Sequence, residues 1–130
     1  MKFYEKILGL KRIEGGELSF KAAALTSGRT HHELLLIEVG DRPGPPPGLR
    51  RGFYHAGFKI GDSLDELKKA YNELLSACVQ VKGLSDHPIS KSIYLHDPDG
   101  NEIELYVDDP DVDWEDDPAV VLSPIRPLDL

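Results

Sequence analysis

The chain is 130 residues long, 40% of them hydrophobic, with a formal net charge of −8. This length is typical of one domain, and the absence of an apolar run of about 18 residues argues against a transmembrane helix. No basic stripe offsets the acidity, so nucleic acid is not an expected partner. Seven of the acids lie between Asp108 and Asp117, which indicates a local, solvated acidic segment.

The N-terminal segment and the cysteine content suggest a compartment. The first ten residues lack the long apolar stretch of a secretory signal. Cys78 is the single cysteine, so an intrachain disulfide is excluded and a reducing, cytoplasmic location is expected. Cys78 lies late on a predicted helix, where we expect a small buried side chain.

The first part of the chain predicts one helix followed by three strands. Apolar residues spaced by four predict a helix over 3–9, and Gly9 is a suitable end for it. Residues 10–14 and 17–26 predict two strands around a turn that contains two glycines. Residues 31–39 are apolar enough to predict a strand buried on both faces.

A Pro- and Gly-rich segment, 40–51, separates this part from the next. Its three consecutive prolines predict a stiff, extended and exposed linker. After it, the alternation over 53–60 predicts a strand. Its apolar face carries Tyr54, Ala56, Phe58 and Ile60, and its polar face carries His55 and Lys59.

A helix and three strands follow. Ser63 and Glu66 have the spacing of a capping box, which predicts the start of the helix. Leu64, Leu67, Tyr71, Leu74 and Cys78 form its apolar stripe. Alternating apolar residues then predict strands near 79–83, 91–97 and 101–107.

Asp97-Pro98-Asp99-Gly100, between the last two strands, has the residues of a type I turn followed by a left-handed glycine. In such a hairpin Asp97 faces Asn101, and Tyr94 lies directly across from Glu104. Because side chains alternate along a strand, one face is an expected core face: Ile93, Leu95, Ile103, Leu105 and Val107. The other face is polar: Ser92, Tyr94, His96, Glu102, Glu104 and Tyr106.

The order of these elements repeats along the chain. The second half reads strand, helix and three strands, and the first half repeats this order without the opening strand. We therefore predict an α+β fold of two βαβββ modules, each curled into a half-cup, with a site between them. A single domain is expected, built of module one (1–39), the linker (40–51), module two (52–109), and an acidic and Pro-rich tail (110–130).

Three segments carry a resemblance to a known family: Asp-His-Pro-Ile-Ser at 86–90, the hairpin at 93–106, and Pro-Leu-Asp-Leu at 127–130. Together with the Phe-Tyr-Glu-Lys-Ile-Leu-Gly segment at 3–9, they resemble the vicinal oxygen chelate superfamily of glyoxalases, bleomycin-resistance proteins and extradiol dioxygenases. Within it, the hairpin looks like the catechol 2,3-dioxygenase branch. The resemblance covers most of the chain, and the combined motifs are specific.

The resemblance implies a metal site. In that branch two histidines and one carboxylate hold Fe(II) or Mn(II), and positions stay open for a catechol and O₂. Carried over by motif, Glu104 is the carboxylate ligand and His55 a histidine ligand. Three catalytic roles follow in the same way: Tyr94 hydrogen-bonds the bound substrate, His32 acts as acid and base beside the metal, and His87 supports the site from outside the ligand set.

The chain departs from this pattern at its start. The resemblance expects a further histidine ligand on a strand just before the helix at 3–9, and Met1 falls within that helix. Three explanations stay open: the protein begins earlier, another residue or chain completes the site, or the activity has been lost.

Plainer roles are open for individual residues. Tyr94 and Glu104 could form a simple cross-strand pair. His55 could be a hydrogen-bonded core histidine, and His87 could be a surface histidine on a turn. His96 and Glu102 lie nearer the turn and are expected to be exposed. His31 is expected to point away from His32, because neighbours on a strand face opposite sides.

Three functions are therefore considered. The first is an extradiol ring-cleavage dioxygenase whose small aromatic substrate chelates a divalent metal through vicinal oxygens. The second is a metal-free module that binds a small aromatic ligand in the same cup. The third is a glyoxalase-like isomerase or lyase, for which Glu38 is the candidate carboxylate in the first module.

A homodimer is the expected assembly. Without its opening strand the first half should have an open sheet edge and an uncovered apolar face, which proteins tend to cover. We expect a second subunit or the tail at 118–130 to cover this gap. Val120, Val121, Leu122, Ile125 and Leu128 give the tail apolar side chains for docking, and three prolines prevent a long strand.

Overall fold

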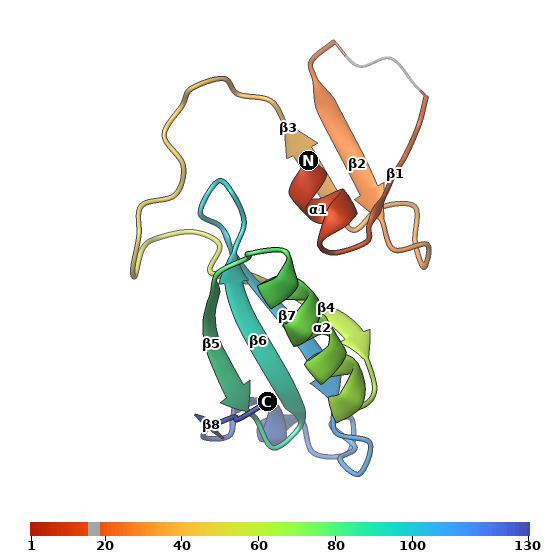
Figure 1. Ribbon diagram of the computed structural model, residues 1–130, viewed down its shortest axis with the longest axis vertical. Helices are drawn as coiled ribbons and strands as arrows, with labels where there is room; N and C mark the ends of the chain where they lie inside the picture. The colour runs from red at the N-terminus through yellow and green to blue at the C-terminus, as the bar shows by residue number, and fades with distance from the viewer. Residues whose placement is uncertain (16–18) are drawn as a thin grey trace. The chain divides into compact units, whose positions relative to one another are not determined.

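The computed structural model describes residues 1–15 and 19–130. The chain forms two compact units, which we call unit 1 (Met1–Pro43) and unit 2 (Gly44–Leu130). The boundary falls inside the predicted linker at 40–51. The start of the predicted strand at 17–26, with the second glycine of the preceding turn, lies outside the described residues. Figure 1 shows the helices and strands of each unit.

Unit 1 contains a short helix and a small sheet. Helix α1 (Lys2–Lys6) is followed by β1 (Lys11–Arg12), β2 (Ala22–Thr26) and β3 (Leu34–Ile37). The strands form an antiparallel sheet in the order β1-β2-β3. Gly9 adopts φ 67°, and the Leu10 amide donates to the Tyr4 carbonyl at 3.0 Å. A left-handed glycine therefore ends this helical segment, as the sequence predicts.

Strand β3 differs from the prediction. The strand covers Leu34–Ile37 rather than 31–39, and it is not buried on both faces. Leu35 is 49% exposed and Ile37 is 51% exposed, whereas Leu34 and Leu36 are half-buried. The prediction was wrong because a continuous apolar run was interpreted as a strand covered on both sides. In unit 1 the run instead forms one exposed and one partly covered face.

Unit 2 contains the complete βαβββ order. Its elements are β4 (His55–Gly61), α2 (Leu64–Ser76), β5 (Val81–Asp86), β6 (Ser90–His96) and β7 (Glu102–Asp108). With the short strand β8 (Arg126–Pro127), the sheet order is β4-β7-β6-β5-β8. Strands β4 and β7 are parallel, and the other neighbours are antiparallel. Parallel pairing brings the first strand of the unit beside its last strand. The α+β class and the module order are confirmed.

The core of unit 2 lies between α2 and one face of the sheet (Figure 1). Ser63 caps the helix by accepting the Glu66 amide, and the Ser63 hydroxyl donates to the Glu66 carboxylate at 2.8 Å. Leu67 and Leu74 are the buried helix residues. The sheet contributes the predicted core face: Ile93, Leu95, Ile103, Leu105 and Val107. Full burial of each large side chain stabilises the fold by roughly 1.5–3 kcal/mol.

Cys78 is exposed, so its predicted burial was wrong. The helix ends at Ser76, and Cys78 lies after it with φ 56°. The Cys78 amide donates to the Leu75 carbonyl, and the Val79 amide donates to the Leu74 carbonyl. This is a left-handed helix end, a position that glycine usually occupies. The apolar stripe therefore ends at Leu74.

The acidic segment and the tail pack on unit 2. Asp108 forms an ion pair with Lys59 at 2.7 Å, and Asp109 forms one with Lys91 at 3.4 Å. The first residues of the acidic segment therefore contact the sheet instead of being fully solvated. After a 3₁₀ turn, η1 (Pro118–Leu122), the short strand β8 (Arg126–Pro127) pairs with the outer edge of β5. The end of the tail therefore extends the sheet of its own unit.

The apolar side chains of the tail differ in exposure. Leu122 is 91% exposed, and Val121 and Ile125 are exposed as well, whereas Val120 and Leu128 are half-buried. Backbone pairing with β5, rather than burial of these side chains, is what holds the end of the tail. None of the described helices has the length and apolar character to cross a membrane.

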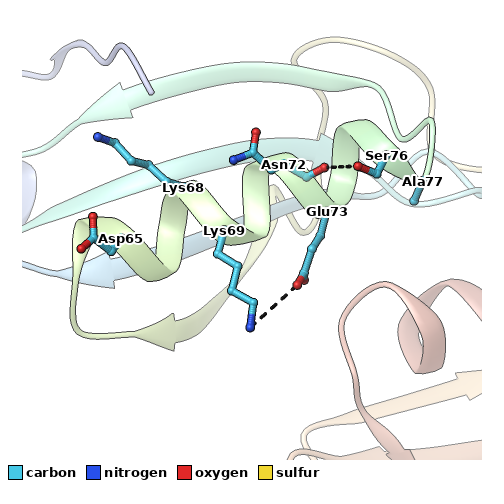
Figure 2. Close-up of a pocket in the computed structure, with 7 residues that line it drawn as sticks. All are labelled: Asp65, Lys68, Lys69, Asn72, Glu73, Ser76 and Ala77. Carbon is cyan, nitrogen blue, oxygen red and sulfur yellow. Dashed lines mark hydrogen bonds and ion pairs between the residues drawn. The ribbon is translucent and has the colours of Figure 1, made fainter.

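The outer face of α2 is shallow, polar and open (Figure 2). There Lys69 pairs with Glu73 at 4.0 Å, and the Ser76 hydroxyl donates to the Asn72 carbonyl at 2.8 Å. These are contacts along one helix, which contribute only a few tenths of a kcal/mol each when solvated, about 0.2–0.5 kcal/mol. We therefore interpret this face as the solvated side of the helix.

Candidate functional site

The hairpin formed by β6 and β7 has the predicted register. Tyr94 lies opposite Glu104. The Asp97 amide donates to the Asn101 carbonyl at 2.9 Å, and the Gly100 amide donates to the Asp97 carbonyl at 3.0 Å. Gly100 has φ 88°, the left-handed backbone that the loop requires. The turn residues therefore determine which side chains lie across from each other on the polar face.

The parallel pairing of β4 with β7 adds a third strand to this polar face. His55 pairs with Glu102, and Gly57 pairs with Glu104. A side chain at Gly57 would begin 3.5 Å from Glu104 Oε2 and 3.3 Å from the Tyr106 ring. The glycine therefore leaves free the space beside the Glu104 carboxylate.

His55 lies between two carboxylates. Its Nε2 is 3.2 Å from Glu104 Oε2, and its Nδ1 is 3.5 Å from Glu102 Oε1. The Glu104 side chain is 14% exposed and the His55 side chain 32% exposed. Among the described residues, buried Nδ1 has no partner with hydrogen-bond geometry. The imidazole is thus held close to Glu104 and less closely to Glu102.

Glu102 was predicted to be exposed, and this prediction was wrong. Its side chain is 25% exposed, and its second oxygen is 4.0 Å from His96 Nε2. The sequence places Glu102 and Glu104 on the same face. The missing information was the parallel neighbour β4, which brings His55 beside Glu102. The turn residues specify pairing within the hairpin only, so they give no signal for this contact.

Tyr94 connects Glu104 to His87. The Tyr94 hydroxyl donates to Glu104 Oε1 at 2.8 Å, and His87 Nε2 lies 3.0 Å from the same hydroxyl. Burial, followed by the hydrogen bond to Glu104, raises the pKa of the Tyr94 phenol above its usual range. The phenol therefore stays protonated near neutral pH. Four side chains form one contact series: His87, Tyr94, Glu104 and His55.

His32 belongs to unit 1 and precedes β3 in a loop. Its Nδ1 lies 2.6 Å from His31 Nδ1, and the two rings are 4.4 Å apart. The expectation that they point to opposite faces was wrong, because neither residue is on a strand. Both side chains are exposed. Glu38, the alternative carboxylate, is also exposed and pairs with Lys21 at 3.2 Å.

The donor set of unit 2 suits part of a metal centre. His55 offers an imidazole nitrogen and Glu104 a carboxylate oxygen, the ligand types that Fe(II) and Mn(II) accept. Two atoms that each ligate one cation at about 2.1 Å lie roughly 3 Å apart when they are adjacent in its coordination sphere. The observed 3.2 Å fits that spacing. Across residues 1–15 and 19–130, no three His, Cys, Asp or Glu side chains are grouped as metal ligands.

Comparisons with known proteins agree with the fold and the motifs. The family described as Glyoxalase/Bleomycin resistance protein/Dioxygenase superfamily matches residues 1–105. Catechol-2,3-dioxygenase of Bacillus subtilis is 31% identical over 117 residues, which are 90% of this chain and 39% of that protein. Biphenyl-2,3-diol 1,2-dioxygenase 2 of Rhodococcus globerulus is 30% identical over 95 residues, 73% of this chain and 47% of that protein. The chain thus spans less than half the length of either curated relative.

A solved structure with the same fold is a glyoxalase/dioxygenase from Nostoc punctiforme. It aligns with a TM-score of 0.67 and 22% sequence identity over 82% of this chain and 80% of that one. Identity this low supports the fold alone. The α+β interpretation therefore rests on the observed elements and on this likeness together.

Proposed function

Because the chain belongs to the Glyoxalase/Bleomycin resistance protein/Dioxygenase superfamily, we propose that it takes part in extradiol cleavage of a catechol-like substrate. The observation that carries this proposal is the contact of His55 Nε2 with Glu104 Oε2 at 3.2 Å, with Tyr94 on the other carboxylate oxygen. The two curated relatives, by name, act on a catechol and a biphenyl diol. Their names support this substrate class.

We assign His55 and Glu104 as the residues of unit 2 that hold a divalent metal, Fe(II) or Mn(II). A metal held there would supply Lewis acidity, which would lower the pKa of the vicinal hydroxyls of a substrate, and open positions for that substrate and O₂. Gly57 leaves the room beside Glu104 that a ligand needs. The negative charge of Glu102 lies 3.5 Å from His55 Nδ1, without hydrogen-bond geometry, and favours the ring orientation in which Nε2 faces Glu104.

Tyr94 is proposed to hold a substrate oxygen. Its phenol is protonated and already donates to Glu104, so a substrate oxygen placed beside the carboxylate would share that donor. His87 keeps the hydroxyl in place through the 3.0 Å contact of its Nε2. His32 remains the proposed acid and base. Its exposed ring is free of ion pairs within the described part of the chain.

The experiment is a turnover assay of the purified protein. Loaded anaerobically with Fe(II) or Mn(II) and mixed with catechol or 2,3-dihydroxybiphenyl, it should consume O₂ and yield a product heavier than the substrate by two oxygen atoms. Glu104→Ala should abolish both signals, and Tyr94→Phe should slow turnover by roughly 10²-fold or more, typical for loss of a general-acid or hydrogen-bonding group. Glu38→Ala is the matched control and should retain turnover.

The same assay separates the two alternatives. A glyoxalase-like isomerase or lyase that uses the first-module carboxylate would lose activity in Glu38→Ala and would not consume O₂. A metal-free binding module would take up catechol without O₂ uptake, with an affinity that a chelator leaves unchanged. A homodimer is proposed as the assembly, and sedimentation at micromolar concentration tests it; a clean monomer would contradict it.

A further inference from the structure

A cavity of about 290 Å³ lies at the turn end of the unit 2 sheet, beside the site. One wall comes from residues 44–50, which we call the strap. The lining includes Pro45, Pro47 and Arg50 on the strap and Tyr54, His96 and Glu102 opposite it. Glu102 belongs to both the cavity and the site, because its Oε1 is 3.5 Å from His55 Nδ1. The cavity and the site therefore share the Glu102 side chain.

The strap is packed against the β6–β7 turn, which gives the cavity a fixed wall. A side chain at Gly44 would begin 2.5 Å from the Asp99 carbonyl oxygen, so only glycine allows this approach. A side chain at Gly100 would lie 4.0 Å from the Pro45 ring. Prolines cannot change φ freely. The predicted exposed linker is thus, in part, a wall held against the hairpin.

Arg50 is a half-buried cation at this cavity. Its Nη1 donates to the Gly48 carbonyl at 3.4 Å, a long contact, and within the described residues it has no ion pair. Other half-buried cations of unit 2 differ. Lys59 pairs with two carboxylates, and so does Lys91. A partly desolvated guanidinium without a carboxylate favours an anion from outside the chain.

The Glu102 carboxylate, which also lines the cavity, does not neutralise Arg50. Its two oxygens are directed at histidines, at 3.5 Å from His55 Nδ1 and 4.0 Å from His96 Nε2. The remaining lining is mostly apolar: proline rings, the exposed Leu49 side chain and the Tyr54 ring. Such surfaces suit a short hydrocarbon chain or the edge of a ring.

We propose that this cavity binds the acidic side chain of the substrate, with the strap and Tyr54 around its hydrocarbon part and Arg50 on its carboxylate. The inference rests on the proposed function, because that function places the vicinal oxygens of the same molecule at His55 and Glu104. It deepens that function by naming a substrate class: catechols with a short carboxylate side chain. Arg50 is then the specificity-determining residue.

Three probes test the proposal by calorimetry at fixed ionic strength: 3,4-dihydroxyphenylacetate, its methyl ester, and phenylacetate. The wild-type protein should bind the dihydroxy acid at least about tenfold more tightly than the ester, as expected for a charge-assisted hydrogen bond. Arg50→Gln should remove this difference. The neighbouring Arg51→Gln, exposed and outside the cavity lining, is the matched control and should retain it.

Equal binding of the acid and the ester by the wild-type protein would overturn the proposal. The proposal would also fail if Arg51→Gln lost the preference for the acid to the same extent as Arg50→Gln. Phenylacetate separates this inference from the proposed function. If its binding depends on Arg50 and the added hydroxyls contribute nothing, the cavity assignment holds and the proposed function fails. If the affinity for the dihydroxy compounds depends on Glu104 and is unchanged in Arg50→Gln, the cavity assignment alone fails. No binding of any probe overturns both.

A second variant tests the position of the strap rather than the charge of Arg50. Gly44→Ala should push the strap away from the Asp99 carbonyl, because the new carbon would begin 2.5 Å from that oxygen. Affinity for acid and ester should fall together, with their ratio changed less than in Arg50→Gln. Unchanged affinity for both in Gly44→Ala would contradict a binding role for the strap.

Discussion

The sheets of the two units differ at the edge beside the last strand. In unit 2, the last strand β7 pairs with β6 on one side and, in parallel, with β4 on the other. In unit 1, the last strand β3 pairs with β2, and the described residues form no strand on its other side. Unit 2 also has a 13-residue helix against its sheet, whereas the helix of unit 1 has 5 residues.

This difference explains where the candidate chemistry lies. One donor of the pair, His55, is on β4, and the other, Glu104, is on β7. The pair therefore exists only where a parallel strand flanks the last strand. In unit 1 the last strand instead carries exposed apolar side chains, Leu35 and Ile37. The flanking strand β4 thus does two things: it pairs with the edge of β7, and it supplies the histidine of the donor pair.

The largest expected effect concerns stability. Leu67→Ala in unit 2 and Leu25→Ala in unit 1 each remove a fully buried side chain. Each should lower the free energy of unfolding by about 3 kcal/mol, the usual result of a cavity in a core. Hydrogen exchange should then accelerate in β5–β7 for Leu67→Ala and in β2 for Leu25→Ala. Acceleration throughout the chain in both variants would show that the units open together.

The next effect concerns the metal. Glu104→Ala should weaken Mn(II) binding by at least about 100-fold, because loss of a supporting contact alone costs roughly 10–100-fold. Glu102→Gln should weaken it by about tenfold through the lost support of His55. Glu38→Ala in unit 1 is the control, since that side chain is exposed and pairs with Lys21. Equilibrium dialysis measures all three, and equal losses would indicate diffuse binding to acids.

A smaller effect is expected at the two helix ends. Unit 1 places Gly9 in the left-handed region, and unit 2 places Cys78 there. Cys78→Gly should stabilise the protein by about 1 kcal/mol, because a side chain is strained in that conformation. Gly9→Ala should destabilise it by a similar amount, about 1 kcal/mol. Thermal unfolding measures both. The same sign for the two variants would contradict this interpretation.

The smallest effect concerns the helix start, which has a side-chain cap in unit 2 and none in unit 1. The Asp62 amide, followed by the Ser63 hydroxyl, lowers the pKa of Glu66. A carboxyl with a lowered folded pKa stabilises the fold above its usual pKa, and this contribution is lost as the pH falls through the folded value.

Glu66→Gln should therefore flatten the acid limb of the stability curve, as measured by urea unfolding between neutral and acidic pH. Ser63→Ala should weaken the same dependence, because it removes one of the donors to Glu66. An unchanged acid limb in Glu66→Gln would assign the pH dependence to other carboxyls.

Local signals in the sequence predicted the hairpin well. The Asp-Pro-Asp-Gly turn specifies which residues face each other, so Tyr94 and Glu104 could be paired before the fold was known. The capping box likewise located the start of α2. In both cases the deciding interactions lie within a few residues along the chain.

Contacts between distant segments were predicted less well. No local pattern reports that β4 lies parallel to β7, so the contact of Glu102 with His55 was missed. The burial of Cys78 was misjudged because an apolar spacing does not show where a helix ends. The strap was interpreted as a free linker, since its packing depends on a glycine opposite a distant carbonyl.

The parallel pairing of β4 with β7 also decides when binding competence arises during folding. β6 and β7 are joined by a short turn, so they can pair early. β4 must close a loop that contains a helix and two strands before it reaches β7, and closing such a loop costs entropy first. Ligand binding should therefore be the last signal to recover on refolding. A nascent chain that has not yet released β7 from the ribosome lacks the donor pair altogether.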